Sequence, residues 1–259
     1  MNAVSPAKRA EIRDHLDAIE AEHGVRVLFA CESGSRAWGF ASPDSDYDVR
    51  FIYARPRDWY LTIEPGRDVI EIPIDDEMDI SGWDLRKALA LLRAGNATVI
   101  EWFDSPIVYR EAEGFADAVR ALAGATYRRD RSFHHYLALS TKAYGEALGA
   151  DEVRLKKFLY ALRTALAASW SLDRMAPPPM RLNDLADAVV TDARVRSQIE
   201  ELVRAKSGLI EQAVYRIPPE LVDFLRKMHA RLESAGVERV APGPASEFDP
   251  LFRDWLPTQ

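Results

Sequence analysis

The stretch GSRAWGFASPDSDYD, residues 34–48, combines a glycine-serine pair with a series of aspartates. In its second half an aspartate stands at every second position, ending at Asp48. The preceding run VRVLFACE (25–32) is apolar and typical of a buried strand, and YDVRFIYA (47–54) alternates as a second strand does. The sequence therefore predicts two strands joined by a glycine-containing turn, with acidic residues where the second strand begins.

Strand-like and helical patterns separate along the rest of the chain. Strand-like segments end near residue 111, whereas later residues repeat apolar positions at helical spacing. These patterns predict an α+β protein with a mixed sheet and helices in residues 1–124 and an all-α domain in 125–259. The further expected strands lie within 68–74, 76–81 and 106–110, and the expected helices within 5–24, 84–95, 100–103, 131–148, 151–172, 181–190, 192–208 and 219–236.

Composition is that of an ordinary globular protein. The chain has 259 residues, of which 47% are hydrophobic and 29% charged, which is enough for a sizeable core. A single cysteine excludes an internal disulfide framework, and no apolar run is long enough to span a bilayer or to act as a signal peptide. We therefore expect a cytoplasmic protein that does not associate with membranes.

Charge is unevenly distributed along the chain. The net charge of −7 argues against a protein that generally coats polyanions. Residues 126–174 nevertheless carry nine Lys or Arg against five Asp or Glu. This segment is suited to attract an anion, whereas the remainder would repel one except through a bound cation.

The acidic residues of the second strand have the spacing of a metal site. Alternate residues of a strand project to one face, so Asp46 and Asp48 would lie side by side, about 7 Å apart. Two such carboxylates repel each other unless a cation lies between them. Mg²⁺ prefers oxygen ligands of this kind and leaves room for substrate phosphates. An Asp-x-Asp pair alone is common on surface turns, and Asp44 is expected to belong to the turn itself.

The turn has the residues of a phosphate site. Its backbone N–H groups and the Ser35 hydroxyl are able to donate to a phosphate, and Arg36 is a further candidate contact. Gly34 and Gly39 would let the backbone approach a ligand closely. The combination of strand, Gly-Ser, second glycine and Asp-x-Asp is far more specific than any of its parts. No nucleophile elbow, Walker loop or dinucleotide fingerprint is present, which argues against those enzyme classes.

A candidate nucleotide contact lies in the helical half. In VRLKKFLYALRTAL (153–166), Lys156, Tyr160 and Arg163 stand at i, i+4 and i+7, which places them on one helical stripe. The two basic side chains would hold phosphates, and the tyrosine would stack on the nucleotide or hydrogen-bond to it. A solvated basic face is the alternative interpretation of this stripe.

Three segments resemble a known family. SGSRAWGFASPDSDYDV (33–49) resembles the signature of the DNA polymerase beta nucleotidyltransferase superfamily. Together with DDEMDISGWDLRKAL (75–89) and KKFLYALRTALAASW (156–170), it is similar to the bacterial RNA repair pathway DNA polymerase beta family, also called RNA-ligase-associated proteins. This resemblance extends over nearly the whole chain. It implies a nucleotidyltransferase catalytic domain at 1–124 and a helical nucleotide- or acceptor-binding domain at 125–259.

The resemblance implies a metal-dependent enzyme that moves a nucleoside monophosphate from a nucleoside triphosphate to a hydroxyl acceptor and releases pyrophosphate. Gly34 and Ser35 would lie at the triphosphate, and Asp46 and Asp48 would bind Mg²⁺ or Mn²⁺. The acceptor would be an RNA end in a repair setting, or a hydroxyl of a protein partner. A catalytically inactive module that binds nucleotide or RNA is the alternative, and the sequence leaves the preferred nucleotide and the oligomeric state open.

The resemblance also implies a third carboxylate on a later strand. Asp75, Glu77 and Asp79 would share one face if their segment is a strand. Asp79 is preferred because it precedes ISGW and the next helix, where the superfamily places its third acid. It would bind metal and accept the proton of the attacking hydroxyl. Glu77 remains the alternative.

Overall fold

The computed structural model describes residues 4–73, 77–147 and 153–257, which fall into two compact units. Both units are discontinuous in sequence: the turn after Gly34 belongs with the helices, and the C-terminal residues belong with the sheet. The separate roles expected for 1–124 and 125–259 stay a prediction. The described residues of the sheet unit are 4–34, 46–73, 77–126 and 242–257, and those of the helical unit are 35–45, 127–147 and 153–241.

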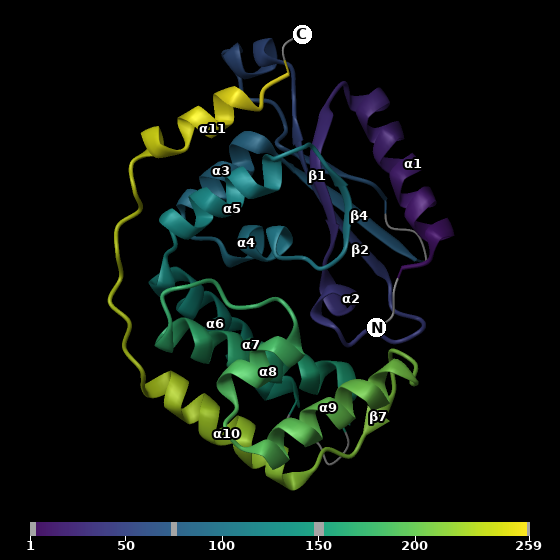
Figure 1. The fold of residues 1–259 in the computed structure, drawn as a ribbon, viewed down its shortest axis with the longest axis vertical. Coiled ribbons are helices and arrows are strands. Elements are labelled where there is room, and N and C mark those ends of the chain that lie inside the picture. The colour runs from purple at the N-terminus through teal and green to yellow at the C-terminus, as the bar shows by residue number, and fades with distance from the viewer. Residues whose placement is uncertain (1–3, 74–76, 148–152, 258–259) are drawn as a thin grey trace. The chain divides into compact units, whose positions relative to one another are not determined.

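A five-stranded mixed sheet forms the centre of the sheet unit (Figure 1). Its strands are β1 (Arg26–Glu32), β2 (Tyr47–Ala54), β3 (Val69–Glu71), β4 (Met78–Asp84) and β5 (Val108–Glu111). The strand order is β3-β4-β2-β1-β5; the β2–β4 pair is parallel and the other three pairs are antiparallel. All five strands lie where the sequence predicts strands, which confirms the α+β prediction for this part of the chain.

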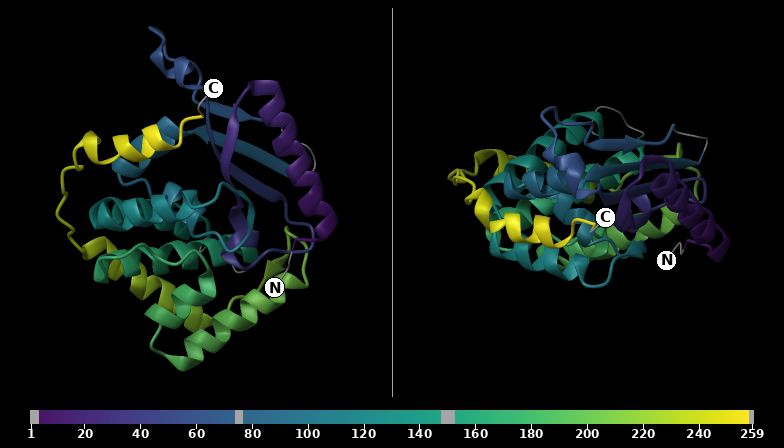
Figure 2. Two further views of the ribbon diagram at one scale, coloured as in Figure 1. Left: turned by 45° about the horizontal axis from the view of Figure 1, so that its top comes forward. Right: turned by 90° about the horizontal axis from the view of Figure 1, so that it is seen from above.

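One face of the sheet is covered by α1 (Pro6–His23), which lies alongside the strands in Figures 1 and 2. The Ser5 side chain caps the start of this helix, and Gly24 ends it in the left-handed conformation at φ 59°. The helix buries one apolar stripe against the strands because its apolar residues recur at helical spacing. These residues are Ile12, Leu16 and Ile19.

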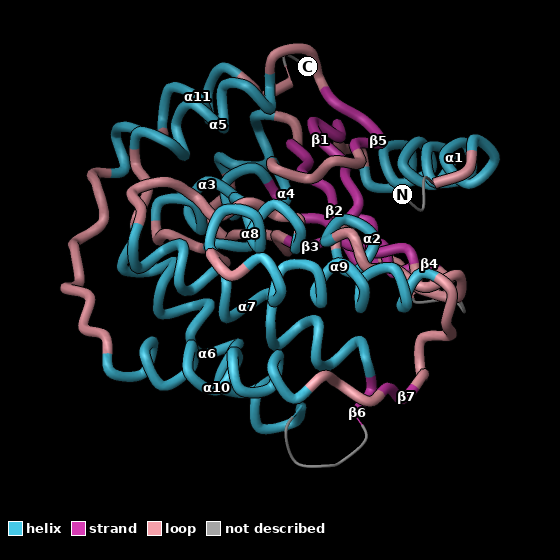
Figure 3. The backbone as a smooth tube through the Cα atoms, turned by 60° about the horizontal axis from the view of Figure 1, so that its bottom comes forward, coloured by secondary structure: helices cyan, strands magenta, loops and turns pink. Residues whose placement is uncertain are grey.

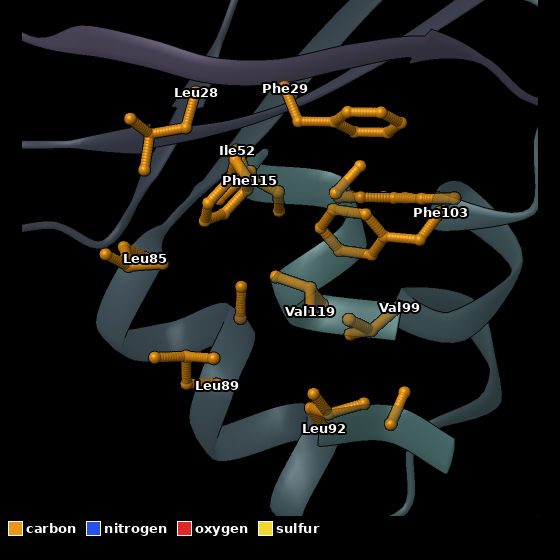
Figure 4. Packing of buried hydrophobic residues seen from close by; sticks show 14 of the residues in the cluster. Leu28, Phe29, Ile52, Leu85, Leu89, Leu92, Val99, Phe103, Phe115 and Val119 are labelled. Atoms are coloured by element: carbon orange, nitrogen blue, oxygen red, sulfur yellow. The ribbon is translucent and has the colours of Figure 1, made fainter. Parts of the chain in front are cut away.

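The other face carries the larger apolar core of the sheet unit (Figure 4). The rings of Phe29 and Phe103 stack there with centroids 4.7 Å apart, and those of Trp83 and Trp102 with centroids 4.0 Å apart. The α5 helix lies where the sequence analysis expects only a domain boundary, although its buried residues Phe115, Ala116, Val119 and Ala123 recur at helical spacing. The helices of this face are α3 (Leu85–Arg93), α4 (Ala97–Phe103), α5 (Phe115–Ala125) and α11 (Asp249–Asp254); the 3-10 helices of the unit are Arg57–Leu61 and Ala245–Glu247.

The helical unit is built around α7, whose side chains are buried on most sides and which contacts the other long helices of the unit (Figure 3). Its helices are α6 (Arg129–Ala147), α7 (Leu155–Asp173), α8 (Leu182–Val189), α9 (Ala193–Ser207) and α10 (Pro219–Ser234), all at predicted positions. The expectation that strands end near residue 111 is wrong in detail, since β6 (Val153–Arg154) pairs with β7 (Val214–Tyr215). Two residues are too few to show alternation.

Of the helices in the described ranges, none has the length and apolarity needed to cross a bilayer.

Candidate active site

The position of Asp48 is determined by the ends of two neighbouring strands. Its N–H donates to Oε1 of Glu32 (3.1 Å), and its carbonyl accepts from the N–H of Ser33 (2.8 Å). Glu32 is buried; its Oε2 accepts from the Tyr109 hydroxyl (2.5 Å), and its carbonyl accepts from that of Ser105 (2.6 Å). The backbone at Asp48 is therefore held by groups that are themselves fixed in the interior.

Asp79 lies directly opposite Asp48 in the parallel β2–β4 pair. Residues paired in this way project to the same face of a sheet. Nη2 of Arg50 donates to Oδ1 of Asp48 (3.2 Å) and to Oδ2 of Asp79 (2.6 Å), and Nη1 donates to the carbonyl of Asp79 (2.7 Å). One guanidinium thus offsets the repulsion between the two carboxylates, whose side chains are 30% and 34% exposed.

Sequence reasoning missed both Glu32 and Arg50. Glu32 ends an otherwise buried strand, and a carboxylate in that position needs hydrogen-bond donors around it. Arg50 stands two residues after Asp48 and therefore on the same face of β2. The alternation that places Asp48 on this face of the strand also places Arg50 there, and this is the sequence signal for Arg50.

The other predicted carboxylates are placed differently. Asp46 is exposed and directly precedes β2. The Glu77 side chain is 66% exposed, and its Oε2 lies 2.8 Å from Nζ of Lys8 on α1. Asp75 lies outside the described residues. Of the two candidates within the described residues, Asp79 is therefore the one that the structure places beside Asp48.

Gly34 packs against the carboxylate of Asp48. Its φ is +59°, and a Cβ added to it would come 1.9 Å from Oδ2 of Asp48. No other residue type fits this position without displacing the acidic side chain. The sequence predicts a flexible turn here, but residues Gly34–Trp38 form a short helix, α2. Ser35 is buried, and its carbonyl accepts from the N–H groups of Gly39 (3.1 Å) and Phe40 (3.0 Å).

The turn after α2 is held by polar contacts within the helical unit. A side-chain nitrogen of Arg36 donates to the carbonyl of Ser45, so this arginine supports the turn as well as being a candidate phosphate contact. The carboxylate of Asp44 accepts from the N–H of Glu211 at 2.8 and 3.0 Å, and this hydrogen bond lowers the pKa of Asp44. Asp44 thus has a turn role, as predicted, with a partner far away in the sequence.

The predicted stripe of α7 does not present one uniform surface. Nζ of Lys156 forms an ion pair with the carboxylate of Glu211. The Tyr160 ring lies 5.3 Å from that of Trp38, between centroids. Arg163 is only 1% exposed; its Nε donates to the carbonyl of Met180 (2.9 Å), and its guanidinium lies 4.8 Å from the Trp38 ring centroid. This burial does not support phosphate binding by Arg163, because its charged group is already packed in the interior.

A cavity of about 210 Å³ opens between α6 and α7. Lys142 and Lys157 contribute positive charge to its wall, and Tyr160 contributes a ring and a hydroxyl, while Leu139 and Ala143 supply apolar surface. This combination suits an anionic ligand that carries an aromatic ring. Sequence reasoning missed the two lysines, although Lys157 and Tyr160 have the i, i+3 spacing of neighbours on a helix.

The chemistry of the acidic site fits a hard divalent cation. Asp48 and Asp79 present carboxylate oxygens on one partly exposed face, which are the ligands that such an ion prefers, while one oxygen of each accepts a hydrogen bond from Arg50. Within the described ranges, no three His, Cys, Asp or Glu side chains converge in a way that could hold a metal ion. The structure thus brings together two of the three predicted metal ligands, with Asp46 two residues before Asp48 in the chain.

The chain is similar to known proteins over most of its length. A family model described as the RNA repair pathway DNA polymerase beta family matches residues 9–254. A protein of Bacillus subtilis (strain 168), named Uncharacterized protein YcgL, is 42% identical over 198 residues, which are 76% of this chain and 76% of that protein. The residues matched by the family model include the acidic site, the turn and the helices α6 to α10 of the helical unit.

Proposed function

Because the chain belongs to the RNA repair pathway DNA polymerase beta family, we propose that it is a metal-dependent nucleotidyltransferase. It would move a nucleoside monophosphate from a nucleoside triphosphate to a hydroxyl acceptor. The observation that carries the proposal is the pairing of Asp48 with Asp79 across parallel strands, with Gly34 packed against the Asp48 carboxylate. This arrangement places two acidic groups side by side, and the missing side chain at residue 34 leaves the space that the Asp48 carboxylate fills.

The reaction forms one bond and breaks one. The oxygen of the acceptor hydroxyl bonds to the α-phosphorus, and the bond from that phosphorus to the bridging oxygen breaks. Pyrophosphate leaves with the electron pair of the broken bond. The proton of the attacking hydroxyl passes to a carboxylate oxygen of Asp79. Asp79 is the acidic residue of β4 that pairs directly with Asp48 of β2.

Asp46, Asp48 and Asp79 would hold Mg²⁺ or Mn²⁺. When bound, such an ion supplies positive charge that stabilises the attacking and leaving oxygens. Arg50 keeps the carboxylates of Asp48 and Asp79 oriented toward each other by donating to both. Glu32 keeps the backbone of Asp48 in place through its N–H.

Nucleotide binding is proposed for the segment that begins with the Gly-Ser pair and for α7 of the helical unit. Gly34, Ser35 and Arg36 would contact the triphosphate, as the family resemblance implies for the first two. In the helical unit, Lys156 and Tyr160 remain candidates, and the positive cavity wall beside Tyr160 supports binding of an anionic ligand there. Arg163 would act indirectly, by supporting the Trp38 ring on which Tyr160 packs.

The acceptor is proposed to be the hydroxyl of an RNA end. The support for this is the family description, which places its members in an RNA repair pathway. The positive balance of residues 126–174 is consistent with a polyanionic acceptor. A hydroxyl of a protein partner would satisfy the same chemistry, and the experiment below separates the two.

The test is transfer of label from each α-labelled nucleoside triphosphate, with Mg²⁺ or Mn²⁺, to an RNA pool with free 3′ hydroxyls. A matched pool with blocked 3′ ends and the variant Asp46→Asn/Asp48→Asn serve as controls. We expect label in the unblocked RNA with the wild-type protein alone. Label on a polypeptide instead of RNA would mean that the acceptor is a protein hydroxyl. Nucleotide binding without label in either acceptor would contradict the transferase proposal and favour a binding module.

A further inference from the structure

A buried ion pair is attached to the turn that leads into Asp46. Lys206, the penultimate residue of α9, is fully buried, and its Nζ donates to the hydroxyl of Ser42 and to Oε2 of Glu211, each at 2.8 Å. The same oxygen of Glu211 accepts from the hydroxyls of Ser42 (2.6 Å) and Ser45 (2.9 Å). One carboxylate oxygen therefore accepts hydrogen bonds from Lys206 and from two serines that lie more than 160 residues before it in the chain.

The turn is closed by its own hydrogen bonds around these hydroxyls. The N–H of Ser42 donates to Oγ of Ser45 (3.0 Å), and the N–H of Ser45 donates to the carbonyl of Ser42 (3.2 Å). Arg36 donates to the Ser45 carbonyl, and the N–H of Glu211 donates to the carboxylate of Asp44. Ser45 is thus held through its N–H, its carbonyl and its hydroxyl, and the next residue in the chain is Asp46.

Burial of this ion pair costs solvation free energy that an apolar pair would not cost. Removing a lysine from water is expensive, and replacing a buried ion pair by apolar residues is often neutral or stabilising. An apolar pair would pack in the same space but could not bond to the hydroxyls of Ser42 and Ser45. The specific contribution of Lys206 and Glu211 is therefore the conformation of the turn.

We propose that Lys206 and Glu211 are positioning residues for Asp46, because they fix Ser42 and Ser45 and the chain passes directly from Ser45 to Asp46. This inference rests on the proposed nucleotidyl transfer for its functional consequence. Neither residue is assigned a contact with the nucleotide or the acceptor. Their effect is on the orientation of the Asp46 carboxylate, and a misplacement of about 1 Å in a catalytic group can cost about 100-fold in rate.

The first test replaces the ion pair by apolar residues in Lys206→Met/Glu211→Leu. A second variant, Ser42→Ala/Ser45→Ala, removes the two hydroxyls and leaves the Lys206–Glu211 and Lys156–Glu211 pairs intact. The control is Asp173→Asn, since the Asp173–Arg231 pair lies in the same unit and does not contact the turn. For both test variants we expect kcat to fall about 10- to 100-fold, with the KM for the nucleotide changed less than about threefold.

A second measurement needs no turnover. Amide hydrogen exchange of peptides covering residues 40–50 should speed up in both test variants and not in Asp173→Asn, because the N–H groups of Ser42 and Ser45 lose their acceptors or their alignment. This measurement decides the positioning inference even where the wild-type protein transfers no nucleotide. Unchanged exchange in these peptides would overturn it. Exchange that rises equally in all helices of the unit would also overturn it, since that result means general destabilisation.

Discussion

The carboxylate of Asp48 lies against the α-carbon of Gly34, so closely that a Cβ at residue 34 would come 1.9 Å from Oδ2. The glycine of the Gly-Ser pair and the second acid of the Asp-x-Asp pair therefore pack directly against each other. The close approach is possible because residue 34 has no side chain and adopts φ +59°.

Gly34→Ala should impair both stability and activity. Gly24→Ala is a matched control, because Gly24 also has φ +59° and has no heavy atom within 4 Å of an added Cβ. Both variants should lose about 1–2 kcal/mol of unfolding free energy from the left-handed backbone. Gly34→Ala alone should also displace Asp48 and reduce nucleotidyl transfer at least about tenfold. Urea unfolding and kcat together measure this, and equal behaviour of the two variants would contradict the packing argument.

Asp79→Asn should abolish most of the transfer activity, whereas Glu77→Gln should leave it near the wild-type value. Asp79 stands opposite Asp48 and shares Arg50 with it, but Glu77 is paired with Lys8 on α1. Loss of a proton-accepting carboxylate typically costs about 100-fold or more in rate. Single-turnover transfer rates measure the difference. If Glu77→Gln were the inactive variant, Glu77 would be the third carboxylate.

Arg50→Met should make the stability of the protein depend on divalent metal. Without the guanidinium, Asp48 and Asp79 face each other uncompensated, at a cost of about 2 kcal/mol for the lost charged hydrogen bonds. Millimolar Mg²⁺ should raise the Tm of this variant more than that of the wild type, because the ion replaces the missing charge. Arg67→Met, which breaks the exposed Arg67–Glu71 pair, should show neither effect. If Mg²⁺ does not change the Tm of Arg50→Met, this result would argue against a metal site at Asp48 and Asp79.

Glu211→Gln should destabilise the protein in a way that depends on pH. Burial alone would raise the pKa of Glu211, but hydrogen bonds from Lys156, Lys206 and the two serines outweigh it and lower this pKa to about 2. A carboxylate with a lowered pKa stabilises the fold above its unfolded value, near pH 4.5, and this stabilisation is lost as the pH falls toward 2.

We therefore expect Glu211→Gln to cost about 3 kcal/mol at pH 7, the order found for breaking a buried pair. The difference from the wild type should shrink as the pH falls from about 4.5. Urea unfolding between pH 3 and pH 7 measures this change. Glu220→Gln, in the exposed Arg194–Glu220 pair, is the control and should change little at any pH. A Glu211→Gln effect of constant size would mean that ionisation of Glu211 does not contribute.

Much of the fold was predictable from local patterns. The strands β1 and β2 follow from an apolar run and an alternating run, and α1 follows from its start at Ser5, its end at Gly24 and its apolar stripe. Such elements are predictable because the signal lies within one segment. The helical spacing of α5 was present in the sequence and was missed. The six-residue α11 was not predictable, since the packing beside it is with residues distant in the chain, as between Phe115 and Trp255.

The sequence by itself determined that a glycine-serine pair precedes aspartates at every second position. It also determined the alternation that places Asp48 and Arg50 on one face of their strand. It left two candidates for the third carboxylate, and only the parallel pairing of β2 with β4 put Asp79 opposite Asp48. Only the tertiary structure showed that Arg163 is buried and that Lys206 and Glu211 hold the turn. The reason is physical: periodicity decides which face of its own segment a side chain takes, whereas its partners and its exposure depend on how distant segments pack.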